Sequence, residues 1–141
     1  MFNPSRDQVR QFFIEAWRKH RARAPTAQLE AIAAELVDMH PEYHALLEAE
    51  DALTREWTPE HGETNPFLHL SLHLAIEEQL GINQPPGIRA IVDQLKQRMD
   101  RHEALHVVLD CLGEIMYQAQ RDKKMPDNNT YLDLLRRAAS R

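Results

Sequence analysis

The sequence predicts an all-α protein, a single-domain helical bundle of about six helices without a sheet. Its 141 residues suffice for one domain with one sizeable core. Four glycines and 6 % aromatic residues argue against a barrel or a sandwich. The periodic segments repeat apolar residues at three and four positions, and none alternates apolar with polar residues as a strand does. We therefore expect residues 1–141 to form one helical domain.

Capping residues and prolines divide the first half of the chain into three expected helices. These open at Asn3–Pro4–Ser5, Thr26 and Glu42, and they end near Ala22, at Pro41 and near Leu53. Trp57 is expected to fill a gap under the loop that follows. The segment 58–64 is that loop, and it contains His61.

A fourth helix is expected from Asn65 to Leu80, because Asn65 is a good N-cap and Pro66 suits the first helical position. Gly81 is expected to end it. Apolar residues from Ile88 onward predict a further helix, either broken at an N-cap, Asp100, or continuous. The polar segment 118–129 is expected to be a loop, and Asp127 or Asn128 near its end is expected to cap a last helix.

Six of the eight histidines form three His-x-x-x-His pairs. They are His40/His44, His69/His73 and His102/His106. Residues four apart on a helix lie on one face, with Cβ atoms about 6 Å apart, so two imidazoles can reach one metal ion. The pair at 40 and 44 is the weakest of the three, because Pro41 interrupts the helix between its members.

Two of these pairs are followed by a carboxylate one helical turn later, which gives the pattern His-x-x-x-His-x-x-x-acid twice. The two patterns run from His69 to Glu77 and from His102 to Asp110. Helices joined by a short connector tend to pack antiparallel, so the two patterns are expected to face each other. Such a ligand set suits zinc, iron or manganese in a bundle core. The expected ligands are His69, His73, His102 and His106, with Glu77 and Asp110 as second choices that either ligate or hold a ligand in place.

The main alternative is a metal-free interaction or regulatory domain whose histidines belong to the core or to an interface. A histidine-ligated haem binder is a further alternative. The segment HEALH, residues 102–106, matches the zinc-peptidase pattern H-E-x-x-H. A peptidase also needs a third ligand and an open cleft, for which a compact helical chain of this length has little room.

Charge and composition narrow the expected location and partners. The net charge of −5 argues against nucleic-acid binding. The basic residues at 18, 19, 21 and 23 are expected to be a solvated helix end. No apolar run is long enough for a membrane span, no signal peptide opens the chain, and the one cysteine, Cys111, excludes an internal disulfide. We expect a cytoplasmic, bacterial protein; its partner stays unknown and a homo-oligomer stays open.

Several stretches carry a resemblance to a known family. NPFLHLSLHLAIEEQL, followed by QPPGIRA, and the MFNPSR start together resemble a bacterial family catalogued as domain of unknown function 1841. The likeness covers nearly the whole chain. It implies a cytoplasmic, all-helical bacterial domain, and it implies no activity, substrate or partner.

Overall fold

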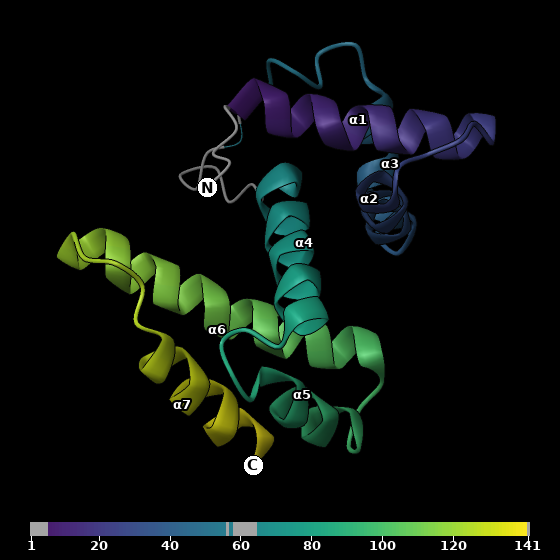
Figure 1. Ribbon diagram of the computed structural model, residues 1–141. Coiled ribbons are helices and arrows are strands. Elements are labelled where there is room, and N and C mark those ends of the chain that lie inside the picture. Colours follow the sequence, from purple (N-terminus) through teal and green to yellow (C-terminus); the bar gives the residue numbers. More distant parts are fainter. Residues whose placement is uncertain (1–5, 56, 58–64, 141) are drawn as a thin grey trace. The chain divides into compact units, whose positions relative to one another are not determined.

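The computed structural model describes residues 6–55, 57 and 65–140 (Figure 1). Of these residues 76 % are helical, and the described part of the chain contains no strand, which confirms the all-α prediction. The described helices number seven α-helices and one short 3-10 helix, η1. They are α1 (Arg6–Ala22), α2 (Gln28–Asp38), η1 (Pro41–Tyr43), α3 (His44–Glu48), α4 (Pro66–Ile82), α5 (Ile88–Lys96), α6 (Arg101–Asp122) and α7 (Asn128–Ala139).

The contacts between residues divide the chain into two compact units, 1–74 and 75–141. The first unit holds α1, α2, η1, α3 and the first half of α4, and the second holds the rest of α4 with α5, α6 and α7. The expectation of one domain stays a prediction, and each unit is described by itself. Among the described helices, none has the length and apolar character needed to cross a membrane.

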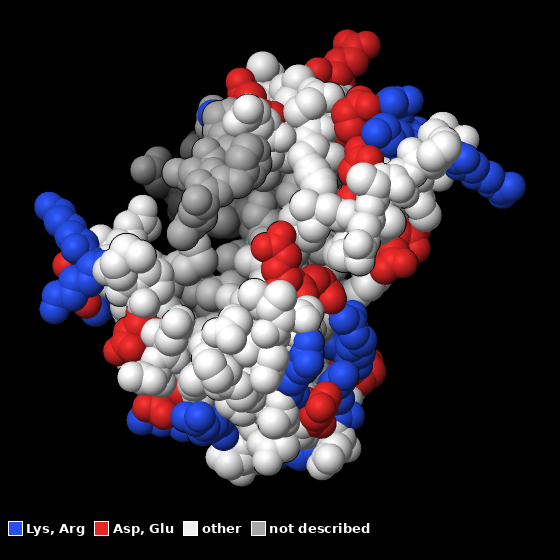
Figure 2. Space-filling model, viewed as in Figure 1, with Lys and Arg blue, Asp and Glu red and all other residues white. Residues whose placement is uncertain are grey.

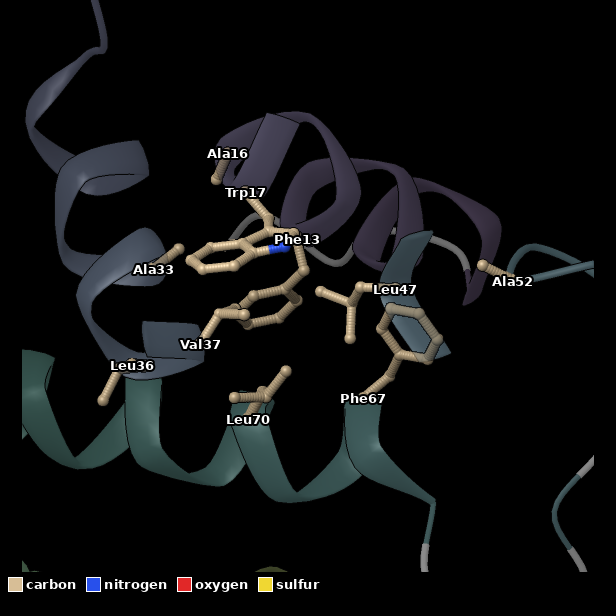
Figure 3. Packing of buried hydrophobic residues seen from close by; sticks show 10 residues of the cluster. All are labelled: Phe13, Ala16, Trp17, Ala33, Leu36, Val37, Leu47, Ala52, Phe67 and Leu70. Atoms are coloured by element: carbon tan, nitrogen blue, oxygen red, sulfur yellow. The ribbon is translucent and has the colours of Figure 1, made fainter. Parts of the chain in front are cut away.

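The core of the first unit is built by apolar side chains from α1, α2, α3 and α4 (Figure 3). Phe13 and Trp17 of α1 are 1 % and 6 % exposed; the Phe13 ring points toward α4, and the Trp17 ring extends toward Ala33 of α2. Burying a side chain of this size stabilises a fold by about 1.5–3 kcal/mol. Leu70 of α4 lies on the opposite side of this core. The first turns of α4, which precede His73, therefore pack against α1 and α2.

Arg10 anchors the turn that follows α3. Its guanidinium is almost fully buried, and Nη1 donates to three carbonyl oxygens: those of Ala52 at 3.3 Å, Leu53 at 3.1 Å and Arg55 at 2.8 Å. The same guanidinium lies 5.1 Å from the ring centroids of both Trp57 and Phe67. Trp57 also packs against the core, while the loop under which it was expected to lie is outside the described residues. Arg10 therefore ties α1 to the turn and to the first residues of α4.

The second unit packs α5, α6 and α7 around a continuous apolar core. Its buried residues include Ile88, Val92 and Leu95 of α5, Leu105, Val108 and Ile115 of α6, and Tyr131 and Leu135 of α7. The Tyr131 hydroxyl donates to Gln79 Oε1 at 2.8 Å, which ties α7 to the second half of α4. Burial raises the pKa of this phenol well above its usual value.

Several predicted helix ends are correct. Asn65 Oδ1 accepts the N–H of Phe67 at 2.9 Å, so Asn65 caps α4. Asp100 Oδ1 accepts the N–H of Glu103 at 2.8 Å, so the chain breaks there into α5 and α6 and is not one continuous helix. Asp127 caps α7. The predicted start at residues 3–5 and the loop 58–64 with His61 lie outside the described residues.

Other predicted ends are wrong by a few residues. Ala27 precedes α2 in place of Thr26, because the Glu30 side chain accepts the Ala27 N–H at 3.0 Å and sets the first turn one residue later. The short helix α3 ends at Glu48, not near Leu53, because the turn bound by Arg10 follows it. Helix α4 continues through Gly81 to Ile82 and ends at Asn83, whose φ is +52°.

The predicted loop from Gln118 is also too long, because α6 continues to Asp122 and only residues 123–127 connect it to α7. Gln120, Arg121 and Asp122 are exposed in the last turn of α6, and glutamine and arginine are good helix formers, so a polar sequence does not by itself end a helix. Lys123, with a φ of +55°, ends the helix.

The basic residues near the end of α1 are engaged in ion pairs with carboxylates. The pairs are Arg18–Glu15 at 2.9 Å, Lys19–Glu30 at 2.8 Å and Arg21–Glu48 at 2.9 Å. On the face shown in Figure 2, Lys and Arg side chains lie interspersed with Asp and Glu. These ion pairs agree with a solvated helix end.

Candidate metal centre

Three imidazole rings of the first unit converge through their Nε2 atoms. His69 Nε2 lies 3.2 Å from His40 Nε2 and 3.2 Å from His73 Nε2. Ligand nitrogens of the three rings all lie within 4.8 Å of one another. His40 is 2 % exposed and His73 is fully buried, whereas His69 is half-buried. We call these three residues the histidine cluster.

Helix α4 places two members of the cluster by its own geometry. His69 and His73 are four residues apart on a helix that Asn65 caps, and their ring centroids lie 4.8 Å apart. The buried residues Leu70 and Ile76 lie on either side of His73 along the helix. The packing of α4 therefore holds His73 inside the protein and leaves His69 nearer to solvent.

His40 is placed by the end of α2. Its Nδ1 lies 2.7 Å from the carbonyl oxygen of Leu36, and because a carbonyl only accepts, Nδ1 carries the proton. In the neutral ring Nε2 then carries the lone pair, the kind of atom that binds a cation, and this is the atom that faces His69. A carbonyl that holds one ring nitrogen is the usual device that orients a metal-binding histidine.

His44 does not join its sequence partner His40. Its Nε2 donates to the Val37 carbonyl at 2.9 Å, and its ring packs 4.3 Å from the Trp17 ring. Pro41 is the reason, because it cannot continue α2 and opens the 3-10 turn η1 instead. Across such a turn residues three apart eclipse, while residues four apart diverge.

The eclipsed residue in this turn is Tyr43, whose N–H donates to the His40 carbonyl at 2.9 Å. Its ring stacks on the His40 ring, with centroids 5.5 Å apart and planes 10° apart. It also meets the His69 ring edge-on, at 5.7 Å and 71°. Partial burial raises the pKa of the Tyr43 phenol, with a smaller contribution from the charge of Glu42.

The spacing in the histidine cluster fits a shared metal ion. Zinc–nitrogen bonds of about 2.0–2.1 Å in a tetrahedron place the nitrogens about 3.3–3.4 Å apart, close to the observed 3.2 Å. A chain of hydrogen bonds fits less well, because one Nε2 atom cannot donate to one neighbour and accept from the other. A cation bound by all three lone pairs accounts for both contacts.

The structure brings together two of the predicted ligands, His69 and His73, and adds His40. The sequence favours His40 least as a ligand, because Pro41 separates it from His44. The informative signal was its own position, one turn beyond Leu36 on the buried stripe of α2. His40 lies in the histidine cluster without His44, so the His-x-x-x-His spacing alone does not indicate it.

The two carboxylates predicted as second choices have other surroundings. Glu77 accepts two hydrogen bonds from Arg101 Nη2, at 2.8 and 3.0 Å, and is half-buried. Asp110 is exposed on α6. In the described part of the chain neither belongs to a group of side chains whose ligand atoms meet.

The remaining predicted ligands lie on α6 in the second unit. The rings of His102 and His106 have centroids 4.2 Å apart, so this pair does lie on one face of its helix, and both residues are half-buried. That they share an ion with His69 and His73 stays a prediction.

Fold and site together define an all-α protein with a cluster of three histidines near its first core. The resemblance found in the sequence is confirmed. The chain belongs to the family described as "Domain of unknown function (DUF1841)", whose model matches residues 5–137. No curated protein and no solved structure matches the chain. The family description carries no activity, so the function has to be argued from the cluster.

Proposed function

We propose that the protein binds one divalent transition metal ion through His40, His69 and His73. The observation that carries this proposal is the pair of 3.2 Å separations between the Nε2 atoms. Two further features support it. The Leu36 carbonyl favours the His40 tautomer in which Nε2 is the ligand atom, and the buried side chains around His73 limit competition from water.

The chemistry of the ligands narrows the metal. Three neutral imidazoles suit zinc, iron, copper or nickel, whereas manganese prefers sites that include carboxylates. Zinc and iron therefore remain from the three metals that the sequence suggested, and tetrahedral spacing favours zinc. The matched pattern in the sequence makes His106 the proposed further ligand, with His102 as the alternative.

The competing function is a metal-free interaction domain whose histidines stabilise the core. It is favoured by one observation, that imidazoles of His40 and His44 both donate to carbonyls at the end of α2. Such bonds give the last carbonyls of a helix side-chain donors without any metal.

The deciding experiment measures metal in protein purified without a histidine tag. We expect about one zinc or iron per chain by mass spectrometry, and a lower melting temperature after chelation. His40→Leu, His69→Leu and His73→Leu should each lose tight binding, because a three-ligand set loses a ligand. His20→Leu is the matched control, since His20 is exposed on α1 and outside the cluster.

The metal-free function predicts the reverse. Wild-type protein without stoichiometric metal and without a response to chelator, combined with leucine variants of unchanged stability, would overturn the metal proposal. His106→Leu and His102→Leu, measured in the same way, test whether either residue supplies a further ligand.

A further inference from the structure

Tyr43 contacts two of the three rings in the histidine cluster. The 3-10 turn that begins at Pro41 places its ring over the ring of His40, with planes only 10° apart. Its ring also meets His69 edge-on at 5.7 Å. Tyr43 packs against the apolar core of the first unit, so its own position is constrained by that core.

We propose that Tyr43 is a positioning residue of the metal site: its ring holds the imidazoles of His40 and His69 in the orientation in which their Nε2 atoms share one ion. This inference rests on the proposed metal site. It goes beyond that proposal because it assigns a role to a side chain that supplies no ligand atom in the cluster.

The physical reason is the freedom that each ring has to lose. An imidazole can rotate about its bond to Cβ, and a metal binds only the orientation in which Nε2 points at it. The Leu36 carbonyl and the Tyr43 face together restrict His40. His69 is the half-buried member and lies nearer to solvent, so an edge contact with an aromatic ring matters more for it. A ring that is already oriented costs less to order when the ion binds.

Tyr43 contacts both histidines through its ring. The ring stacks face to face on the His40 ring and meets the His69 ring edge-on. Phenylalanine offers the same ring, whereas leucine and methionine offer apolar volume without it. The proposal therefore predicts that Tyr43→Phe keeps the site intact and that Tyr43→Leu loosens it.

The experiment compares wild type, Tyr43→Phe, Tyr43→Leu and Tyr43→Met, with zinc and cobalt(II) as probes. Zinc affinity is measured by competition with a chromophoric chelator, and the cobalt absorption spectrum reports ligand geometry. We expect Tyr43→Phe to match wild type. Tyr43→Leu and Tyr43→Met should bind zinc about tenfold more weakly, since aromatic contacts contribute roughly that factor. Their cobalt spectra should also change.

Tyr117→Leu is the matched control, because Tyr117 is an exposed tyrosine on α6, and its affinity and spectrum should not change. Circular dichroism confirms that each variant is helical before binding is measured, and Tyr43→Met serves if Tyr43→Leu does not fold. Wild-type affinity and spectrum in the variants without a ring overturn the positioning role alone. Equal loss in Tyr43→Phe overturns it too, because the hydroxyl would then be the active group. Failure of wild type to bind either probe overturns the proposed function itself.

Discussion

Pro41 separates two histidines that the sequence spaces as a pair. Without an N–H, Pro41 cannot extend α2, and the 3-10 turn that it opens sends His40 toward His69 and His44 toward Trp17. Sequence spacing alone assumes a continuous helix. It therefore favours His69 and His73, which lie within α4, over His40, the proposed ligand at a helix end.

Replacing Pro41 tests this account directly. In Pro41→Ala the N–H returns, α2 can extend, and His40 and His44 move toward one face of the same helix. We expect metal affinity to fall by about tenfold or more, as it does when the surroundings of a ligand are disturbed. The measurement is zinc competition with a chelator. Pro25→Ala is the control, since Pro25 lies in the connection between α1 and α2 and is not part of the histidine cluster. An unchanged zinc affinity in Pro41→Ala would contradict the argument.

Asp127 gives a prediction about pH. Its carboxylate accepts the Thr130 hydroxyl at 2.9 Å and the Asn129 N–H at 3.0 Å, and these hydrogen bonds hold its pKa below the usual range. A group with a lowered folded pKa stabilises the fold above its unfolded pKa of about 3.9, and this contribution is lost as pH falls through the folded pKa. The cap of α7 should therefore weaken in acid.

The variant Asp127→Asn keeps a capping side chain and removes its titration. We expect wild type to lose more melting temperature than Asp127→Asn between about pH 5 and pH 2, because only the aspartate becomes protonated. Asp127→Ala should melt below both at pH 7. Parallel profiles for wild type and the asparagine variant across this range would show that Asp127 contributes no pH dependence.

At the scale of elements, the sequence predicts which segments are helical better than where they end. The starts of α4, α6 and α7 were predictable because each has a side chain whose cap is local: Asn65, Asp100 and Asp127. The start of α2 depends on a glutamate that reaches back to Ala27, and the end of α4 on an asparagine rather than a glycine. Local propensity ranks such alternatives closely, so propensity alone does not decide between them.

The turn after α3 is held by a residue that lies about forty positions earlier, which no local pattern reveals. Arg10 donates to three carbonyl oxygens there, and its guanidinium lies 5.1 Å from the ring centroids of both Trp57 and Phe67. Removing the guanidinium leaves buried carbonyls without a donor. Arg10→Met should therefore destabilise the protein by about 2–3 kcal/mol.

This cost is measured by urea denaturation of wild type and variant. Arg18→Met is the matched control, because Arg18 is exposed on the same helix and pairs only with its neighbour Glu15; its midpoint should stay near that of wild type. If Arg10→Met unfolded at the same urea concentration as Arg18→Met, the turn would not depend on the guanidinium.

At the scale of the whole molecule, the histidine cluster joins segments that are distant in sequence. His40 and His69 are 29 residues apart, and α3 and the Arg10-bound turn lie between them. A metal that holds both ends of such a segment acts on the first unit as a covalent bridge does, by restricting the unfolded chain. The sequence predicts the four-residue spacing of His69 and His73 on α4. It does not predict that His40 lies beside them, because this depends on where α2 ends.

Metal binding should therefore stabilise the protein unevenly. A free metal concentration of one hundred times Kd adds about 2.7 kcal/mol to the stability of whatever unfolds with the site. Hydrogen exchange can locate that addition. We expect amides of η1 and of residues 66–74 in α4 to exchange more slowly with zinc than after chelation, because these segments carry or adjoin the proposed ligands.

Amides of α7 serve as the internal reference, since Asp127, Tyr131 and the apolar core of the second unit hold that helix independently of the three imidazoles. Equal slowing in α7 and at the ligands would show that the metal acts on one cooperative whole, and no slowing at η1 would place the ion elsewhere.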